Sequence, residues 1–103
     1  MHLVRIKRNR TPTHPGAVLR EDVFPAMGVS VTQAARKMGV SRQGLHKVLA
    51  EQRSITPEMA VRIGKYVGNG GGLWLRMQAA YDLWQAERLL AREVAAIPTQ
   101  AAA

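Results

Sequence analysis

The stretch of sequence between Ser30 and Val48 constrains the fold of this chain more than any other. Its first half predicts a helix that begins after the N-cap Ser30, with Gln33 placed to complete a capping box. Gly39 is expected to end this helix, because glycine enters the left-handed conformation of a tight helix exit without steric cost. Ser41 then suits the N-cap of a second helix. The stretch is therefore typical of two short helices joined by a tight turn.

The two predicted helices separate apolar from polar side chains. The side chains expected to be buried are Ala34, Ala35, Met38, Leu45, Val48 and Leu49. The polar side of the second helix consists of Arg42, Gln43, His46 and Lys47. This spacing is that of a helix-turn-helix, whose second helix enters the DNA major groove, where Arg and Gln can bind base edges through two hydrogen bonds. The alternative is an ordinary pair of packed helices with a solvated polar face.

The positive charge of the chain is concentrated around this motif. The net charge is +8, and the residues up to Arg53 carry ten Lys or Arg against three Asp or Glu, which leaves +1 for the remainder. A surface that binds DNA phosphates requires such a distribution. A basic RNA-binding protein would show a similar sum, and the Arg-rich start could also be a solvated tail.

Several other classes of function find no support in the composition. There is no cysteine, which fits a cytoplasmic protein and leaves neither disulfides nor a thiolate metal site. The three histidines, His2, His14 and His46, share no ligand spacing, so we expect no metal and no cofactor. No apolar run approaches the ~18 residues that a membrane span needs. No carboxylate pair or nucleophile–base pair indicates an enzyme or a small-molecule substrate.

Proline, glycine and helix-capping residues outside this stretch predict three further helices. Residues 1–13 are expected to form a flexible basic arm, residues 14–97 the helix-turn-helix domain, and residues 98–103 a disordered tail. A first helix should begin at Pro15 and end near Pro25. After the motif, a polar loop carries Arg53, which is well placed for a phosphate. The next helix should begin after Thr56, and the glycine run at 70–72 is expected to be a flexible joint.

A long last helix is predicted from about residue 73 to about residue 96, with two apolar stripes. The first stripe consists of Leu73, Trp74, Met77, Ala80, Tyr81 and Trp84. The second consists of Leu75, Ala79, Leu83, Ala86 and Leu90, and polar residues including Gln78 separate the two. One stripe can cover the domain's own core. We expect the second to be a dimer or partner interface, because exposed apolar area of that size usually marks one.

Three segments together resemble the HigA family of antitoxins, which are Cro/cI-type helix-turn-helix proteins of the XRE superfamily. They read HPGAVLREDVF, VTQAARKMGVSRQGLHKVLAEQRSITPEMAVRIGKYVG and LWLRMQAAYDLWQAE, and the resemblance covers roughly residues 12–87. It implies an all-α, five-helix, lambda repressor-like domain with a long C-terminal helix. It also implies a homodimer that binds double-stranded operator DNA, represses its own operon and holds a RelE- or HigB-like mRNA endonuclease toxin inactive.

The resemblance also implies roles for single residues. Gln33 would contact phosphate, and Thr32 and Ser41 would bond the DNA backbone. The side chains that lie at the groove would be Arg42, Gln43, His46 and Lys47. Gly44 departs from the family pattern, since relatives often carry Thr or Ser there. It costs about 1 kcal/mol of helix stability relative to Ala and is expected to allow a close approach to DNA. The alternative function is a stand-alone, phage repressor-like regulator without a toxin partner.

Overall fold

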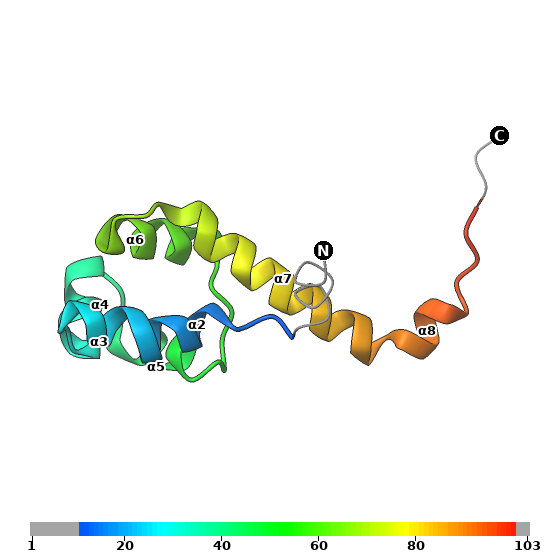
Figure 1. The fold of residues 1–103 in the computed structure, drawn as a ribbon, viewed down its shortest axis with the longest axis horizontal. Coiled ribbons are helices and arrows are strands. Elements are labelled where there is room, and N and C mark those ends of the chain that lie inside the picture. The colour runs from blue at the N-terminus through cyan, green and yellow to red at the C-terminus, as the bar shows by residue number, and fades with distance from the viewer. Residues whose placement is uncertain (1–10, 101–103) are drawn as a thin grey trace, which may run out of the picture.

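The computed structural model describes residues 11–100, and every regular element in that range is helical. The all-helical class that the sequence predicted is therefore confirmed. Most of the expected N-terminal arm (1–13) and half of the expected C-terminal tail (98–103) lie outside the described residues. Figure 1 shows a helical body from which the last helices extend to one side.

The first helical stretch is continuous but contains a wide turn. It consists of α2 (Pro15–Val18), the π-helical η1 (Leu19–Val23) and α3 (Phe24–Met27). The sequence predicted an end near Pro25, but the helix continues to Met27. Pro25 has no N–H to donate, and the backbone N–H of Phe24 just before it bonds to the carbonyl of Leu19 in a π-type turn. Pro25 stands in the first turn of α3, where a missing N–H costs no helical hydrogen bond, so the helix continues past it.

The helix-turn-helix forms as the sequence predicted. It consists of α4 (Val31–Met38) and α5 (Arg42–Leu49). The capping box is present, with Gln33 N donating to Ser30 Oγ at 3.1 Å and Ser30 N donating to Gln33 Oε1 at 3.0 Å. Gly39 ends α4 in the left-handed region, at a φ of 72°. The local rules of capping are therefore enough to explain both ends of α4.

Three helices follow the motif: α6 (Pro57–Val67), α7 (Gly71–Leu89) and α8 (Ala91–Ala95). The sequence predicted one helix where α7 and α8 stand. The two are separated at Leu90, whose φ of −105° and ψ of 15° depart from helical values. Along residues 11–100, no helix combines the length and apolar character that crossing a lipid bilayer requires.

The expectation of a flexible joint at the glycine run was wrong. Gly70 is the N-cap of α7, and Gly71 already belongs to the helix. A β-carbon on Gly64 of α6 would lie 2.1 Å from the Gly70 carbonyl carbon, and one on Gly71 would lie 3.0 Å from the Ala60 carbonyl oxygen. The glycines thus let the backbones of α6 and α7 touch. The connection is a tightly packed corner.

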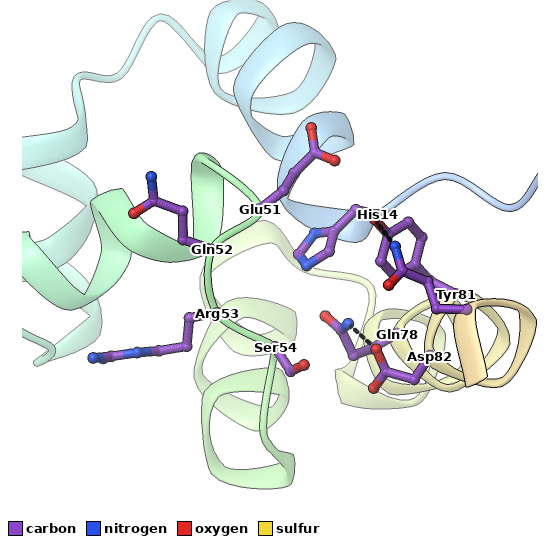
Figure 2. Close-up of a pocket in the computed structure, with 9 residues that line it drawn as sticks. His14, Glu51, Gln52, Arg53, Ser54, Gln78, Tyr81 and Asp82 are labelled. Atoms are coloured by element: carbon purple, nitrogen blue, oxygen red, sulfur yellow. Dashed lines mark hydrogen bonds between the residues drawn. The ribbon is translucent and has the colours of Figure 1, made fainter. Parts of the chain in front are cut away.

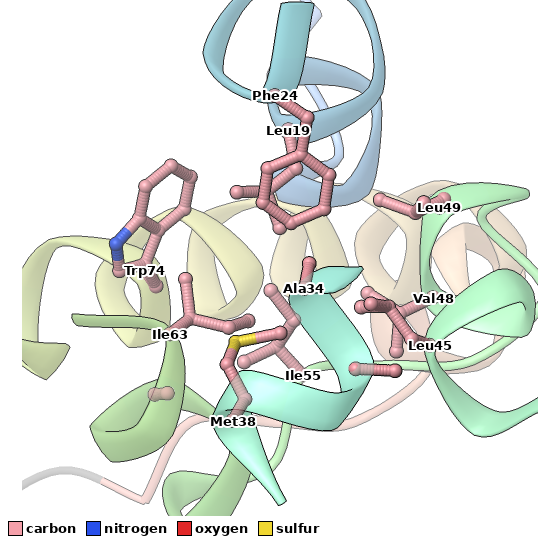
Figure 3. Packing of buried hydrophobic residues seen from close by; sticks show 12 residues of the cluster. Leu19, Phe24, Ala34, Met38, Leu45, Val48, Leu49, Ile55, Ile63 and Trp74 are labelled. Carbon is pink, nitrogen blue, oxygen red and sulfur yellow. The ribbon is translucent and has the colours of Figure 1, made fainter. Parts of the chain in front are cut away.

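The core gathers side chains from η1, from α3 to α7 and from the loop before α6 (Figure 3). It contains Leu19, Phe24, Ala34, Ala35, Met38, Leu45, Val48, Leu49, Ile55, Ala60, Ile63 and Trp74. All six side chains that the motif was predicted to bury are among them. Burial of this apolar surface, at ~25 cal/mol per Å², is what holds α4 and α5 at a fixed angle to the rest.

The two stripes of α7 differ in their surroundings, with some departures from the prediction. Trp74 of the first stripe is buried, and Met77, Tyr81 and Trp84 are half-buried. Two members of that stripe, Leu73 and Ala80, are exposed, because the buried side of α7 is narrower than predicted. Gln78, which was expected to separate the stripes, is buried instead. The whole second stripe is exposed, with Leu83 at 60%.

Candidate nucleic-acid interface

The outer face of α5 presents the polar side chains that the sequence assigned to DNA. Arg42, Gln43 and His46 are exposed and together line one shallow depression on the surface. Lys47, on the same helix, is half-buried. Arg42 and Gln43 are in the first helical turn of α5, where the N–H groups also point outward and the helix dipole is positive. This end of α5 can therefore offer an anionic ligand both side-chain and backbone donors.

Side chains at the start of both motif helices retain donors after making their caps. Ser41 Oγ accepts from Gly44 N at 2.9 Å, which leaves the hydroxyl proton free to donate. Gln33 uses its Oε1 in the capping box, so its amide nitrogen stays available. Thr32 is exposed beside it. These three side chains can each donate a hydrogen bond to a phosphate oxygen.

The cations of this face keep their charge unpaired within the described part of the chain. The ion pairs found there join Arg20 to Glu21 and Glu51, and Arg62 to Glu58. None of them includes Arg42, Lys47 or Arg53 among residues 11–100. An incoming polyanion would therefore meet charges that no neighbouring carboxylate among these residues neutralises.

The loop between α5 and α6, which carries Arg53, is held from behind by α7. Ile55 is buried, and its N–H donates to Gln78 Oε1 at 2.8 Å. Gln78 Nε2 in turn donates to Asp82 Oδ1 at 2.9 Å. Figure 2 shows Gln78 and Asp82 on one side of the loop, with the Arg53 side chain pointing to the opposite side. The loop is therefore fixed while its guanidinium faces outward.

The C-terminal end of α5 is closed by the first helix. Arg20 Nη1 donates to the Leu49 carbonyl at 2.6 Å and contacts Glu51 Oε2 at 3.3 Å. Glu51 adopts a φ of 62°, a conformation that side-chain-bearing residues seldom take. The contacts with Arg20 hold this turn at the start of the Arg53 loop. The pKa of Arg20 is raised, chiefly by its hydrogen bond to Glu21 and to a smaller extent by the one to Glu51.

His14 is a structural residue beside the same loop. Its Nδ1 accepts from Gly16 N at 2.9 Å and so caps the first helix, and its ring meets the edge of Tyr81 at 5.0 Å between centroids. Burial lowers the pKa of His14, against the opposing effect of Glu51 and Asp82. The neutral form that remains is the one that can accept the Gly16 hydrogen bond.

Gln78 is a positioning residue that the sequence reasoning missed. It was read as a solvent-facing spacer, yet it is 2% exposed and holds the loop of Arg53. A signal was present: Gln78 follows Trp74 by four residues and precedes Tyr81 by three, so all three share one helix face. A polar side chain among inward-facing aromatics predicts a buried hydrogen bond rather than a solvated gap.

The structure also corrects the expectation for Gly44. Gly44 is buried, and the space beside its Cα is occupied by Ser41 Oγ and by the guanidinium of Arg53. The missing side chain at position 44 therefore makes room for Ser41 and Arg53 of the same chain, and not for DNA. In residues 11–100 there is also no group of three or more His, Asp or Glu that could hold a metal ion.

Comparison with known proteins agrees with this geometry. The family model described as helix-turn-helix matches residues 20–69. Virulence-associated protein I of Dichelobacter nodosus is 40% identical over 82 residues, which cover 79% of this chain and 76% of that protein. Antitoxin HigA-1 of Vibrio cholerae is 30% identical over 78 residues, covering 76% and 73% respectively. The solved structure of the Pseudomonas aeruginosa antitoxin HigA with the higBA promoter superposes with a TM-score of 0.82 at 28% identity, covering 87% of this chain and 99% of that one.

Proposed function

The chain belongs to the helix-turn-helix family that includes the HigA antitoxins, and from this we propose that it binds its own operator, represses its own operon and neutralises a HigB-like toxin. The observation that carries the DNA-binding part is the outer face of α5. There Arg42 and Gln43, in the first turn of α5, and His46, one turn further on, line the same exposed depression. The similar HigA antitoxin from Pseudomonas aeruginosa is described with promoter DNA, which supports the same class of ligand.

We further propose that a dimer binds the operator. The second stripe supports this, since Leu75 and Leu83 are 37% and 60% exposed on α7, whose other side packs on the core, and Leu90 at its C-cap is 47% exposed. A second copy of the chain would cover this apolar face. Two helix-turn-helix motifs related in this way would read half-sites about one helical turn, ~34 Å, apart. The operator would then be an inverted repeat.

The toxin partner in this proposal is a RelE-like mRNA endonuclease. Its support is the relationship to proteins named as HigA antitoxins. We assign the toxin to a surface other than the α5 face, because that face carries the unpaired cations suited to DNA. Repression and neutralisation would then be separable by mutation.

The DNA part is tested by Arg42→Ala and Gln43→Ala. Each substitution should weaken binding to the operator by about 1–3 kcal/mol and should weaken binding to random DNA of equal length much less, because a lost base contact matters only at the right base. Titration of both DNAs with each variant gives the comparison.

Arg92→Ala is the matched control for this measurement. It removes one positive charge from the exposed α8, away from α5, and should leave discrimination between the two DNAs unchanged. Equal losses on operator and random DNA for Arg42→Ala would mean that this side chain contacts only phosphate.

The toxin part is tested by co-expression with the gene next to this one. The wild-type chain should co-purify with the product and restore growth to cells that express it. Arg42→Ala should still restore growth while relieving repression of the operon, since the two functions use different surfaces. A neighbouring product that is not toxic, or does not bind, would favour the stand-alone regulator.

A further inference from the structure

Gly44 lies between two donors that come from different parts of the chain. A β-carbon on Gly44 would lie 2.8 Å from Ser41 Oγ and 3.2 Å from Arg53 Nη1. Ser41 is the N-cap of α5, whereas Arg53 belongs to the loop after α5. The hydroxyl and the guanidinium therefore border the same small space, which a β-carbon at position 44 would crowd.

The backbone does not require a glycine at this position. Gly44 is inside α5 and is not among the glycines with positive φ, so any residue could adopt its conformation. Glycine lowers helix stability relative to alanine. The feature of its surroundings that favours glycine is the close approach of the Arg53 guanidinium and the Ser41 hydroxyl.

Arg53 is fixed at its base and unpaired at its tip. Its loop is anchored by the hydrogen bond from buried Ile55 N to Gln78 Oε1. Its guanidinium makes no ion pair or hydrogen bond with the residues of the described range. An arginine placed in this way is pre-organised for an anion that comes from outside the chain.

We propose that Gly44 is a positioning residue for DNA binding, because it leaves the room in which the Arg53 guanidinium lies beside the Ser41 hydroxyl, so that both bind one phosphate of the operator. This inference rests on the proposed operator binding and adds the pairing of these two donors. The guanidinium supplies the charge, and the hydroxyl, whose oxygen already accepts from Gly44 N, supplies a directed second hydrogen bond. A β-carbon at position 44 would force the Ser41 hydroxyl to shift and the guanidinium to give by a few tenths of an ångström, which would misalign both donors on this phosphate.

A double-mutant cycle tests the proposal. Gly44→Ala and Arg53→Ala should each weaken operator binding about tenfold and reduce the salt dependence of binding by about one phosphate contact. The double variant should lose little more operator affinity than either single variant does. Arg92→Ala should combine additively with Gly44→Ala, because it removes a charge on α8. A cycle in which the losses at positions 44 and 53 multiply would overturn the inference, whereas failure of the wild-type chain to bind its operator would contradict the proposed function as well.

A second measurement does not depend on the Gly44 variant. Single operator phosphates are replaced one at a time by neutral methylphosphonates, and binding is measured for the wild type, Ser41→Ala and Arg53→Ala. Replacement of one particular phosphate should weaken operator binding by the wild type. It should have little further effect on binding by either variant, since both have already lost that contact. If Ser41→Ala were insensitive to replacement of one phosphate and Arg53→Ala to replacement of another, the two residues would act separately, against the inference.

Discussion

Replacing Gly64 by alanine is expected to lower the free energy of unfolding by about 3 kcal/mol, the upper end of what overpacking usually costs. The new β-carbon would lie 2.1 Å from the Gly70 carbonyl carbon and 2.4 Å from Gly71 N. Both are backbone atoms at the start of α7 and cannot turn aside as a side chain can. The two helices would have to separate, which would uncover Trp74 and Ile63. Thermal or urea unfolding followed by circular dichroism measures the effect.

Gly72→Ala is the matched control. Its β-carbon would meet the tip of the Arg76 side chain at 2.9 Å, which can move away at little cost. Because alanine is the better helix former, this variant should be as stable as the wild type or more stable, by up to about 1 kcal/mol. If both variants unfolded at the wild-type midpoint, the corner between α6 and α7 would not be tightly packed.

Replacing Leu83 by glutamate is expected to reduce operator affinity by about 100-fold or more while leaving the domain folded. Leu83 is 60% exposed, so its removal costs little core packing. In the proposed dimer it would place a charge in an apolar interface. Losing the dimer removes the gain in effective concentration that links the two half-sites, which is on the order of 10²–10⁴. Sedimentation equilibrium, with operator titration at matched concentrations, measures both effects.

Gln85→Glu provides the control for charge, because it introduces the same negative charge on another side of α7. Gln85 is exposed and bonds only to the Tyr81 hydroxyl at 2.8 Å, a contact that a carboxylate can keep. This variant should stay dimeric and bind the operator normally. A Leu83→Glu protein that sediments as an unchanged dimer and forms an unchanged toxin complex would remove the second stripe from the proposed interface.

The sequence by itself determined the motif and its outward face. Ser30, Gln33, Gly39 and Ser41 act on backbone groups within a few residues of themselves, so their caps follow from local chemistry alone. The helical period then decides which side chains of α4 and α5 turn inward, and all six predicted ones are in the core. The residues expected to face DNA were found by the same logic, although their contacts with DNA remain predictions.

Only the tertiary structure decided the features that depend on segments meeting from far apart in the chain. A glycine run reads locally as a joint, and it becomes a packed corner because Gly64 and Ala60 of α6 lie against it. From the sequence, Gln78 was interpreted as a solvated spacer, whereas in the structure it is the buried acceptor for the N–H of Ile55. From the sequence, Gly44 was read as a cost to its helix and a close approach to DNA, and only the structure shows the Arg53 guanidinium beside it. In each case the determining contact joins residues that no local rule relates, since which surfaces meet is fixed by how the whole core packs.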